Sequence, residues 1–132
     1  MKQNSRFFAK LFNKTHRQNI EVTVDIIEYQ EEDIFYVYSP ALDLIGYGQN
    51  DQEARQSWEV ILEEYLDYAL NKKTLIKDLQ SRGWVVKGKK QFKPPTFSWM
   101  LQHNEQLTDM YNKHNFHKTS RPISVPFAEV YA

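Results

Sequence analysis

Residues 33–54, DIFYVYSPALDLIGYGQNDQEA, contain the signals that decide the fold of this chain. Apolar side chains run through the first part. Pro40 predicts the end of a strand there, because it lacks an amide hydrogen and restricts the residue before it to extended geometry. Gly46 and Gly48 flank Tyr47, where we expect a second short strand. Asn50, with a glutamate three residues later, predicts the N-terminal cap of a helix. The stretch therefore predicts a strand, a tight connection, a second strand and the start of a helix.

The neighbouring residues extend this pattern into a small sheet with a covering helix. Apolar and polar residues alternate over residues 20–29, which predicts a half-buried strand, and the acidic turn at residues 30–33 joins it to the next strand as a hairpin. With residues 42–48, we expect a three-stranded antiparallel meander. Apolar residues then recur every three or four positions over residues 51–70, which predicts a long amphipathic helix that covers the sheet. The expected fold class is α+β.

Shorter elements follow this helix. Thr74 precedes a second, short helix at residues 75–82, and Gly83 is placed to be its left-handed C-terminal residue. Residues 84–86 suggest a fourth short strand. A basic connection at residues 88–95 is the one plausible linker.

Residues 96–132 are expected to contain one more helix and one short strand. Thr96 predicts the cap of a helix whose apolar side chains, over residues 97–111, lie along one side. Residues 113–118 are polar and rich in histidine, and the short stretch 122–126 is bounded by prolines, as is typical of an edge strand. The domain boundaries that follow are a basic arm or short helix at 1–19, an α+β domain at 20–87 and a C-terminal helix-plus-strand extension at 88–132.

Length and composition are those of one small domain. The chain has 132 residues, of which 41% are hydrophobic and 14% aromatic, so it is long enough to bury a single core. It has no run of about 18 apolar residues and no signal-peptide pattern, and we therefore expect a cytoplasmic protein that does not enter a membrane. Because the chain has no cysteine, disulfides, thiolate metal sites and a cysteine nucleophile are excluded.

The formal charges cancel over the whole chain but are segregated along it. Residues 1–19 contain five cations and no acid, residues 20–71 contain thirteen acids and one arginine, and residues 72–132 contain eleven cations and four acids. Such a distribution suits a charged partner, or the packing of the basic ends on the acidic middle.

The titratable residues do not form a recognisable catalytic or metal site. Acids gather at the predicted hairpin tip, and Asp25 and Asp43 lie on neighbouring strands, but they form no ordered carboxylate motif for a divalent metal. His103, His114 and His117 lack the spacing of zinc ligands. We therefore expect no metal, no cofactor and no enzymatic activity.

A basic stretch with interleaved aromatic residues gives the best signal for nucleic-acid binding. Its lysines would contact phosphates, and its rings would stack on a base. An alternative function is therefore a nucleic-acid-binding regulator that uses the basic N- and C-terminal segments. The lysines are Lys87, Lys89, Lys90 and Lys93, and the rings are those of Trp84 and Phe92.

The order of motifs in the middle of the chain is specific enough to suggest a family. An acidic hairpin tip leads to an aromatic strand ending in proline, then to a short leucine-containing link, a strand with a glycine, and a helix start with the pattern N-D-Q-E-A. These parts are Glu31-Glu32-Asp33, Phe35 to Pro40, Ala41-Leu42, Gly48 and Asn50 to Ala54. Over roughly residues 20–82 the chain resembles the HicB-like antitoxin domain. The family's Leu-Pro-Gly-Cys run is replaced by residues 42–45, Leu-Asp-Leu-Ile.

The resemblance implies a three-stranded sheet covered by a helix, and a non-catalytic module that binds and neutralises a small basic HicA-like mRNA-degrading toxin. The acidic middle of the chain suits such a partner by charge. Members of this family often carry a C-terminal DNA-binding domain, but residues 96–132 match none, so DNA or RNA binding is not carried over. The residues expected to contact the partner are Glu31, Glu32, Asp33, Tyr36, Tyr38, Glu59 and Glu63.

The last predicted strand also suggests self-association. Residues 123–125 are expected to pair with a sheet edge, either that of the same chain or that of a second copy. Pairing with a second copy would make a homo-oligomer, most simply a dimer.

Overall fold

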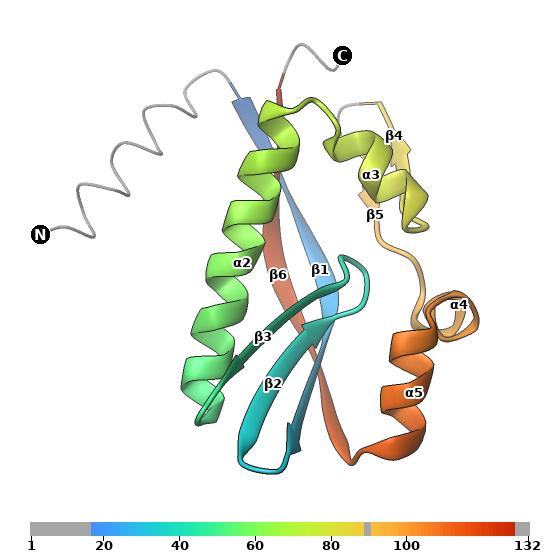
Figure 1. Ribbon diagram of the computed structural model, residues 1–132. Helices are drawn as coiled ribbons and strands as arrows, with labels where there is room; N and C mark the ends of the chain where they lie inside the picture. Colours follow the sequence, from blue (N-terminus) through green and yellow to red (C-terminus); the bar gives the residue numbers. More distant parts are fainter. Residues whose placement is uncertain (1–16, 89–90, 129–132) are drawn as a thin grey trace, which may run out of the picture.

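A four-stranded antiparallel sheet forms the centre of the structure (Figure 1). The computed structural model describes residues 17–88 and 91–128, and the strands of this sheet lie in the order β3-β2-β1-β6. The α+β class expected from the sequence is confirmed. The strands are β1 Arg17–Glu31, β2 Ile34–Ser39, β3 Leu44–Gly48 and β6 Phe116–Ala128, with a separate hairpin of β4 Val85–Lys87 and β5 Gln91–Lys93. The helices are α2 Asp51–Asn71, α3 Leu75–Ser81, α4 Phe97–His103 and α5 Glu105–Lys113.

The predicted meander is present as β1, β2 and β3, each antiparallel to the next. The β1–β2 turn includes Glu32, whose φ of 57° is in the left-handed region. Pro40 directly follows β2, as expected from its missing amide hydrogen. β1 is longer than the predicted strand, because it begins at Arg17, inside the segment assigned to the arm.

The start of α2 is fixed by the cap that the sequence predicted. The side chain of Asn50 accepts a hydrogen bond from the Glu53 amide at 2.9 Å. The carboxylate of Glu53 reaches back to accept one from the Gln49 amide at 3.1 Å. These reciprocal bonds satisfy the Glu53 amide, which the first helical turn leaves without a partner, and the Gln49 amide just before the cap.

The two glycines of β3 allow α2 to approach the sheet closely. A Cβ atom at Gly46 would lie 2.3 Å from the backbone nitrogen of Trp58, and one at Gly48 would lie 2.4 Å from Cβ of Glu53. Trp58 is then buried between helix and sheet, where its Nε1 donates to Oγ of Ser39 at 2.8 Å. This helix therefore covers the sheet face that carries the even-numbered residues of β1.

The C-terminal strand differs most from its prediction. A short edge strand was expected at residues 122–126, whereas β6 runs for 13 residues and pairs with β1 along its whole length. Pro122 lies opposite Thr23, and Pro126 lies opposite Asn19. Because β6 is an edge strand, these prolines fit where their missing amide hydrogens face away from β1, and they leave that outer edge with fewer donors for another strand.

The single helix predicted over residues 97–111 is two helices, α4 and α5, and that prediction was wrong. Asn104 separates them, with φ −128° and ψ 101°, and its side chain accepts from the Leu107 amide at 3.1 Å. An asparagine that caps the following turn competes with continuation of the preceding helix. The apolar spacing alone could not reveal this break.

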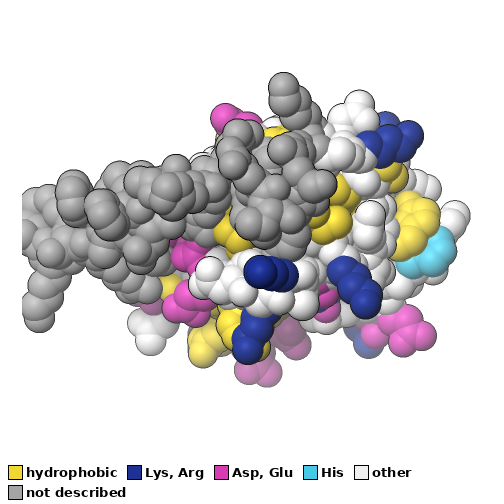
Figure 2. All heavy atoms as spheres, turned by 90° about the horizontal axis from the view of Figure 1, so that it is seen from above, with side chains coloured by type: hydrophobic (Ala, Val, Ile, Leu, Met, Phe, Trp, Pro, Cys, Tyr) yellow, Lys and Arg dark blue, Asp and Glu magenta, His cyan; other side chains and the backbone are white. Residues whose placement is uncertain are grey.

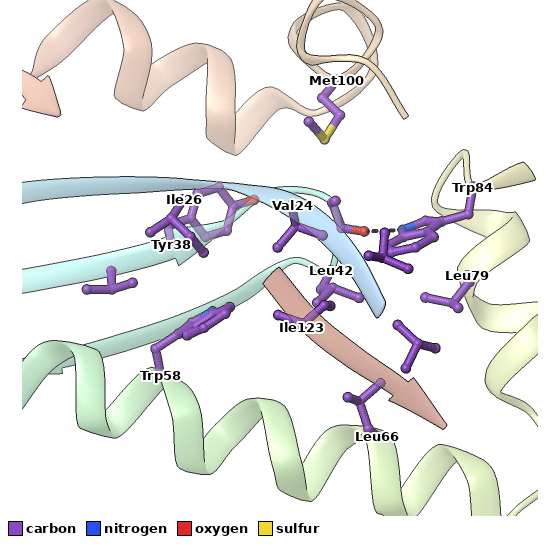
Figure 3. Close-up of a cluster of buried hydrophobic side chains, with 14 of the residues drawn as sticks. Val24, Ile26, Tyr38, Leu42, Trp58, Leu66, Leu79, Trp84, Met100 and Ile123 are labelled. Carbon is purple, nitrogen blue, oxygen red and sulfur yellow. Dashed lines mark hydrogen bonds between the residues drawn. The ribbon is translucent and has the colours of Figure 1, made fainter. Parts of the chain in front are cut away.

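The basic connection predicted at residues 88–95 contains β5 and therefore belongs to a hairpin. The predicted domain boundary between residues 87 and 88 falls inside this hairpin. Trp84 anchors it, since its Nε1 donates to the carbonyl oxygen of Ala41 at 2.7 Å (dashed line in Figure 3). Gly83 has φ +94°, as expected for the residue that ends α3.

Both faces of the sheet contribute to one hydrophobic core. Figure 3 shows Trp58 and Leu66 pointing toward the strands from α2, and Met100 approaching them from the opposite side. Leu107 and Met110 of α5 belong to the same buried cluster. Of the arm predicted at residues 1–19, residues 1–16 lie outside the described residues, and so do Lys89 and Lys90.

Candidate functional site

A row of aromatic side chains crosses the sheet on the face opposite α2. The strand register places Phe116 of β6 opposite Tyr29 of β1, Tyr29 opposite Tyr36 of β2, and Tyr36 opposite Tyr47 of β3. Side chains at such opposed positions on one face have Cβ atoms about 5 Å apart. We call these four residues the aromatic row. It contains one ring from each strand of the sheet.

The rings of the row differ in exposure. Tyr29 and Tyr36 stack with ring centroids 5.0 Å apart and planes 17° from parallel, and both side chains are half-buried. Burial raises the pKa of the Tyr29 hydroxyl, with smaller contributions from Tyr36 and Glu31. Tyr47, on the edge strand, is 63% exposed. The row is therefore partly buried at its centre and exposed to solvent at the β3 end.

The acidic hairpin tip lies at the end of the strands that carry the row. Glu31, Glu32 and Asp33 are all exposed in and beside the β1–β2 turn. His114 connects the tip to the row. Its ring stacks on Tyr29 with centroids 5.2 Å apart, and its Nε2 lies 3.8 Å from a carboxylate oxygen of Glu31. Exposed carboxylates thus lie at the end of the strands that carry the tyrosine rings, and His114 contacts both kinds of group. We call this part of the molecule the tip surface; its members are Glu31, Glu32, Asp33, His114, Tyr29, Tyr36 and Tyr47.

The structure brings together four of the seven residues predicted to contact a partner. Glu31, Glu32, Asp33 and Tyr36 belong to the tip surface. Tyr38 does not, although the sequence places it on the same strand face. It is only 2% exposed because α4 and α5 cover that part of the sheet.

Two further predicted contact residues lie elsewhere. Glu59 and Glu63 are on α2, beside a hollow of about 300 Å³ that α2 forms with the neighbouring strands β1 and β6. Glu59 pairs with Arg121 of β6. Both glutamates therefore lie on the side of the sheet that α2 covers, and they are not part of the tip surface.

Sequence reasoning missed Tyr47 and Phe116 as site residues. Tyr47 alternates with two glycines, and this spacing could have indicated a side chain on the face away from the helix. Phe116 lies in a stretch interpreted as a polar loop, so its place in the row depends on pairing with a strand distant in sequence. Tyr111 also lies here, 46% exposed, with its ring centroid 5.2 Å from that of Phe116.

The buried Tyr38 has a structural role. Its hydroxyl donates to Oδ1 of Asp43 at 2.7 Å and accepts from Nδ2 of Asn104 at 2.9 Å. The pKa of Tyr38 is raised, first by burial and then by the bond to Asp43. These bonds join the β2–β3 loop to the junction between α4 and α5.

A second polar cluster surrounds Arg82 at the end of α3. Its guanidinium lies 3.5 Å from Asp78 and 3.8 Å from Asp43, and Asp78 also accepts from the Tyr65 hydroxyl. Burial raises the pKa of Tyr65, and the bond to Asp78 adds to this effect. The adjoining cleft of about 400 Å³ is lined by Arg82, Asp43 and the stacked rings of Trp99 and His103. Because the guanidinium already has two carboxylate partners, we assign this cluster a structural role.

The structure agrees with only part of the nucleic-acid-binding surface that the sequence suggested as an alternative. Lys87 and Lys93 are exposed on the β4–β5 hairpin, but Trp84 and Phe92 are 3% and 6% exposed. The prediction that these two rings stack on a base is therefore wrong, since they pack inside the core. Figure 2, which looks down on this end of the molecule, shows separate dark-blue cations with acidic and uncharged groups between them on the part that the described residues form.

Within residues 17–88 and 91–128, no three histidine, aspartate or glutamate side chains lie close enough together to hold a metal ion. Asp25 pairs with Lys118 at 3.8 Å, whereas Asp43 bonds to Tyr38. The prediction that Asp25 and Asp43 lie on neighbouring strands was wrong, because Asp43 lies in the β2–β3 loop, and the two acids have separate partners. None of the described helices is long and apolar enough to cross a membrane.

Comparisons of the chain with protein-family models, with curated proteins and with solved structures found no match.

Proposed function

We propose that this protein is a non-catalytic binding module that acts as a HicB-like antitoxin and neutralises a small, basic, HicA-like ribonuclease toxin in the cytoplasm. The observation that carries the proposal is the tip surface, where three exposed carboxylates adjoin a row of tyrosine rings. The resemblance of residues 20–82 to HicB-like domains supplies the partner class.

The two chemistries of the tip surface support different parts of binding. Carboxylates at an exposed turn attract a basic protein over long range, which raises the association rate. Tyrosine rings supply large contact area with little loss of side-chain freedom, and such residues are enriched among the strongest contributors to binding energy. A surface that joins both suits a basic partner better than a phosphate backbone, which the carboxylates would repel.

The test is co-expression with the product of a neighbouring short, basic reading frame, with cell growth as the measure of toxicity. We expect the wild-type chain to restore growth and the Glu31→Lys/Glu32→Lys/Asp33→Lys variant to fail. Calorimetry on the purified proteins should show that this reversal weakens binding at least about tenfold, and that wild-type affinity falls as salt is raised.

The matched control reverses three exposed acids that lie away from the tip, in the variant Glu21→Lys/Glu64→Lys/Asp109→Lys. It makes the same change in net charge and should still restore growth. Equal loss in both triple variants would show that net charge, and not the tip surface, governs binding. Steep salt-dependent binding of the isolated protein to RNA or DNA in a filter assay would instead favour the nucleic-acid regulator.

A further inference from the structure

The aromatic row is stacked at its centre, where Tyr29 lies against Tyr36, and it ends in an exposed ring on the edge strand β3. His114, Tyr29 and Tyr36 stack in sequence, with centroid separations of 5.2 Å and 5.0 Å. Tyr47 lies opposite Tyr36 on β3, the last strand in the sheet order. No strand of the described sheet lies beyond Tyr47. The 63% exposed ring of Tyr47 is therefore where a further planar group can be added.

The molecule already places basic side chains between aromatic rings and carboxylates at three other positions. His114 lies against Tyr29 and Glu31 at the tip surface. Arg121 has its guanidinium carbon 5.9 Å from the centre of the Trp58 ring and pairs with Glu59. Lys118 has its nitrogen 4.7 Å from the Phe97 ring and 3.8 Å from Asp25. Tyr47 lies opposite Tyr36, which is three residues along the chain from Asp33, and no basic side chain of the described residues lies over its ring.

We propose that the partner docks through an arginine whose guanidinium stacks on Tyr47 and whose neighbouring basic groups pair with Glu31, Glu32 and Asp33. This inference rests on the proposed function, because it names the partner chemistry of the same tip surface. The span is short: about 10 Å of extended chain separates Asp33 from Tyr36, which lies beside Tyr47.

Arginine fits this position better than lysine. The guanidinium is planar and weakly hydrated, so it stacks on a tyrosine face while its N–H groups still reach carboxylates. A lysine ammonium is a compact, strongly hydrated charge that gains less from the ring. A purely apolar anchor would not use the acids of the tip.

The experiment titrates the full chain with two synthetic, capped peptides that are identical except that one carries arginines where the other carries lysines. Affinity is measured by calorimetry, and the contact is located by amide NMR shifts. We expect the arginine peptide to bind about fivefold more tightly and to shift Tyr36 and Tyr47. Tyr47→Leu should remove this preference, whereas Tyr47→Trp should increase it.

The matched control is Tyr68→Leu, because Tyr68 is 64% exposed on α2 and has the nitrogen of Lys72 5.7 Å from its ring centre. It should leave the preference unchanged. Equal affinity for the two peptides, a preference that survives in Tyr47→Leu, or shifts confined to another surface would overturn the inference. If both peptides bind equally and the triple reversal at residues 31–33 abolishes both, the proposed function stands while the arginine inference fails. If neither peptide binds, the arginine inference fails, whereas the proposed function is decided by the co-expression test.

Discussion

The two faces of the central sheet are covered in different ways. On one face, α2 runs for 21 residues and approaches β3 so closely that glycine is required at residues 46 and 48. On the other face, two short helices cover only part of the sheet. Tyr38 is buried beneath them, whereas Tyr47 is left exposed. Figure 1 shows the long helix and the two short ones on different sides of the strands.

Because of this difference, we expect the stability of the protein and its binding of a partner to depend on different faces of the sheet. The central side chains between α2 and the sheet, such as those of Ala54 and Trp58, are almost fully buried, so changes there should alter the free energy of unfolding. Rings at the open end of the aromatic row contribute little burial, so changes there should alter binding alone.

Gly46→Ala should destabilise the protein by about 3 kcal/mol, because the added methyl group would overlap the backbone of α2 at Trp58 and Ala54. Chemical denaturation measured by circular dichroism gives the value. Gly88→Asn is the control: Gly88 has φ +61° and nothing within 4 Å of an added Cβ, and asparagine tolerates this backbone conformation. An equal loss in both variants would contradict close helix–sheet packing as the cause.

Trp58→Phe should cost about 2 kcal/mol, since it leaves a cavity and removes the buried bond to Ser39. In a double-mutant cycle with Ser39→Ala, the two changes should be non-additive because they remove the same bond. Trp99→Phe, at a ring that is 38% exposed on the other side of the molecule, should cost less. Simple additivity in the cycle would argue against the bond.

Alkaline pH should destabilise the protein through its buried tyrosines. Because the folded-state pKa of Tyr38 is raised above its ordinary value of about 10, the unfolded chain releases this proton first. Its stabilising contribution is therefore complete below pH 10 and is lost as the pH rises toward the folded-state pKa, by about 1.4 kcal/mol per pH unit.

Denaturation at pH 8, 9.5, 10.5 and 11 measures this dependence, and Tyr38→Phe is the matched variant. Its unfolding free energy should fall less steeply above pH 10 than that of the wild type. A remaining slope is expected from Tyr65, whose pKa is also raised. Parallel curves for the two proteins would mean that the Tyr38 hydroxyl does not titrate differently in the two states.

Tyr47→Ser should change the free energy of unfolding by less than about 1 kcal/mol, because the ring is exposed on an edge strand. The same variant should lose most binding of a basic partner. A large loss of stability would show that the row is a packing feature, and the separation between the two faces would then fail.

The local elements were predictable because their signals lie close together in the chain. The cap at Asn50, the end of β2 at Pro40 and the left-handed Gly83 are each confirmed. The break between α4 and α5 was missed because an asparagine such as Asn104 can lie either along the side of a helix or at its N-terminal cap. The acids of the tip surface were also predictable, since an exposed turn can hold adjacent charges at little cost.

The sequence by itself determined the α+β class, the meander, the long amphipathic helix and the segregation of charge. Only the tertiary structure decided that β6 pairs with β1 throughout, that Tyr38, Trp84 and Phe92 are buried, and that Phe116 completes the aromatic row. The physical reason is one of range. Caps, turns and periodicity depend on residues a few positions apart, whereas burial and strand pairing depend on which distant segments compete successfully for the same sheet edge and face.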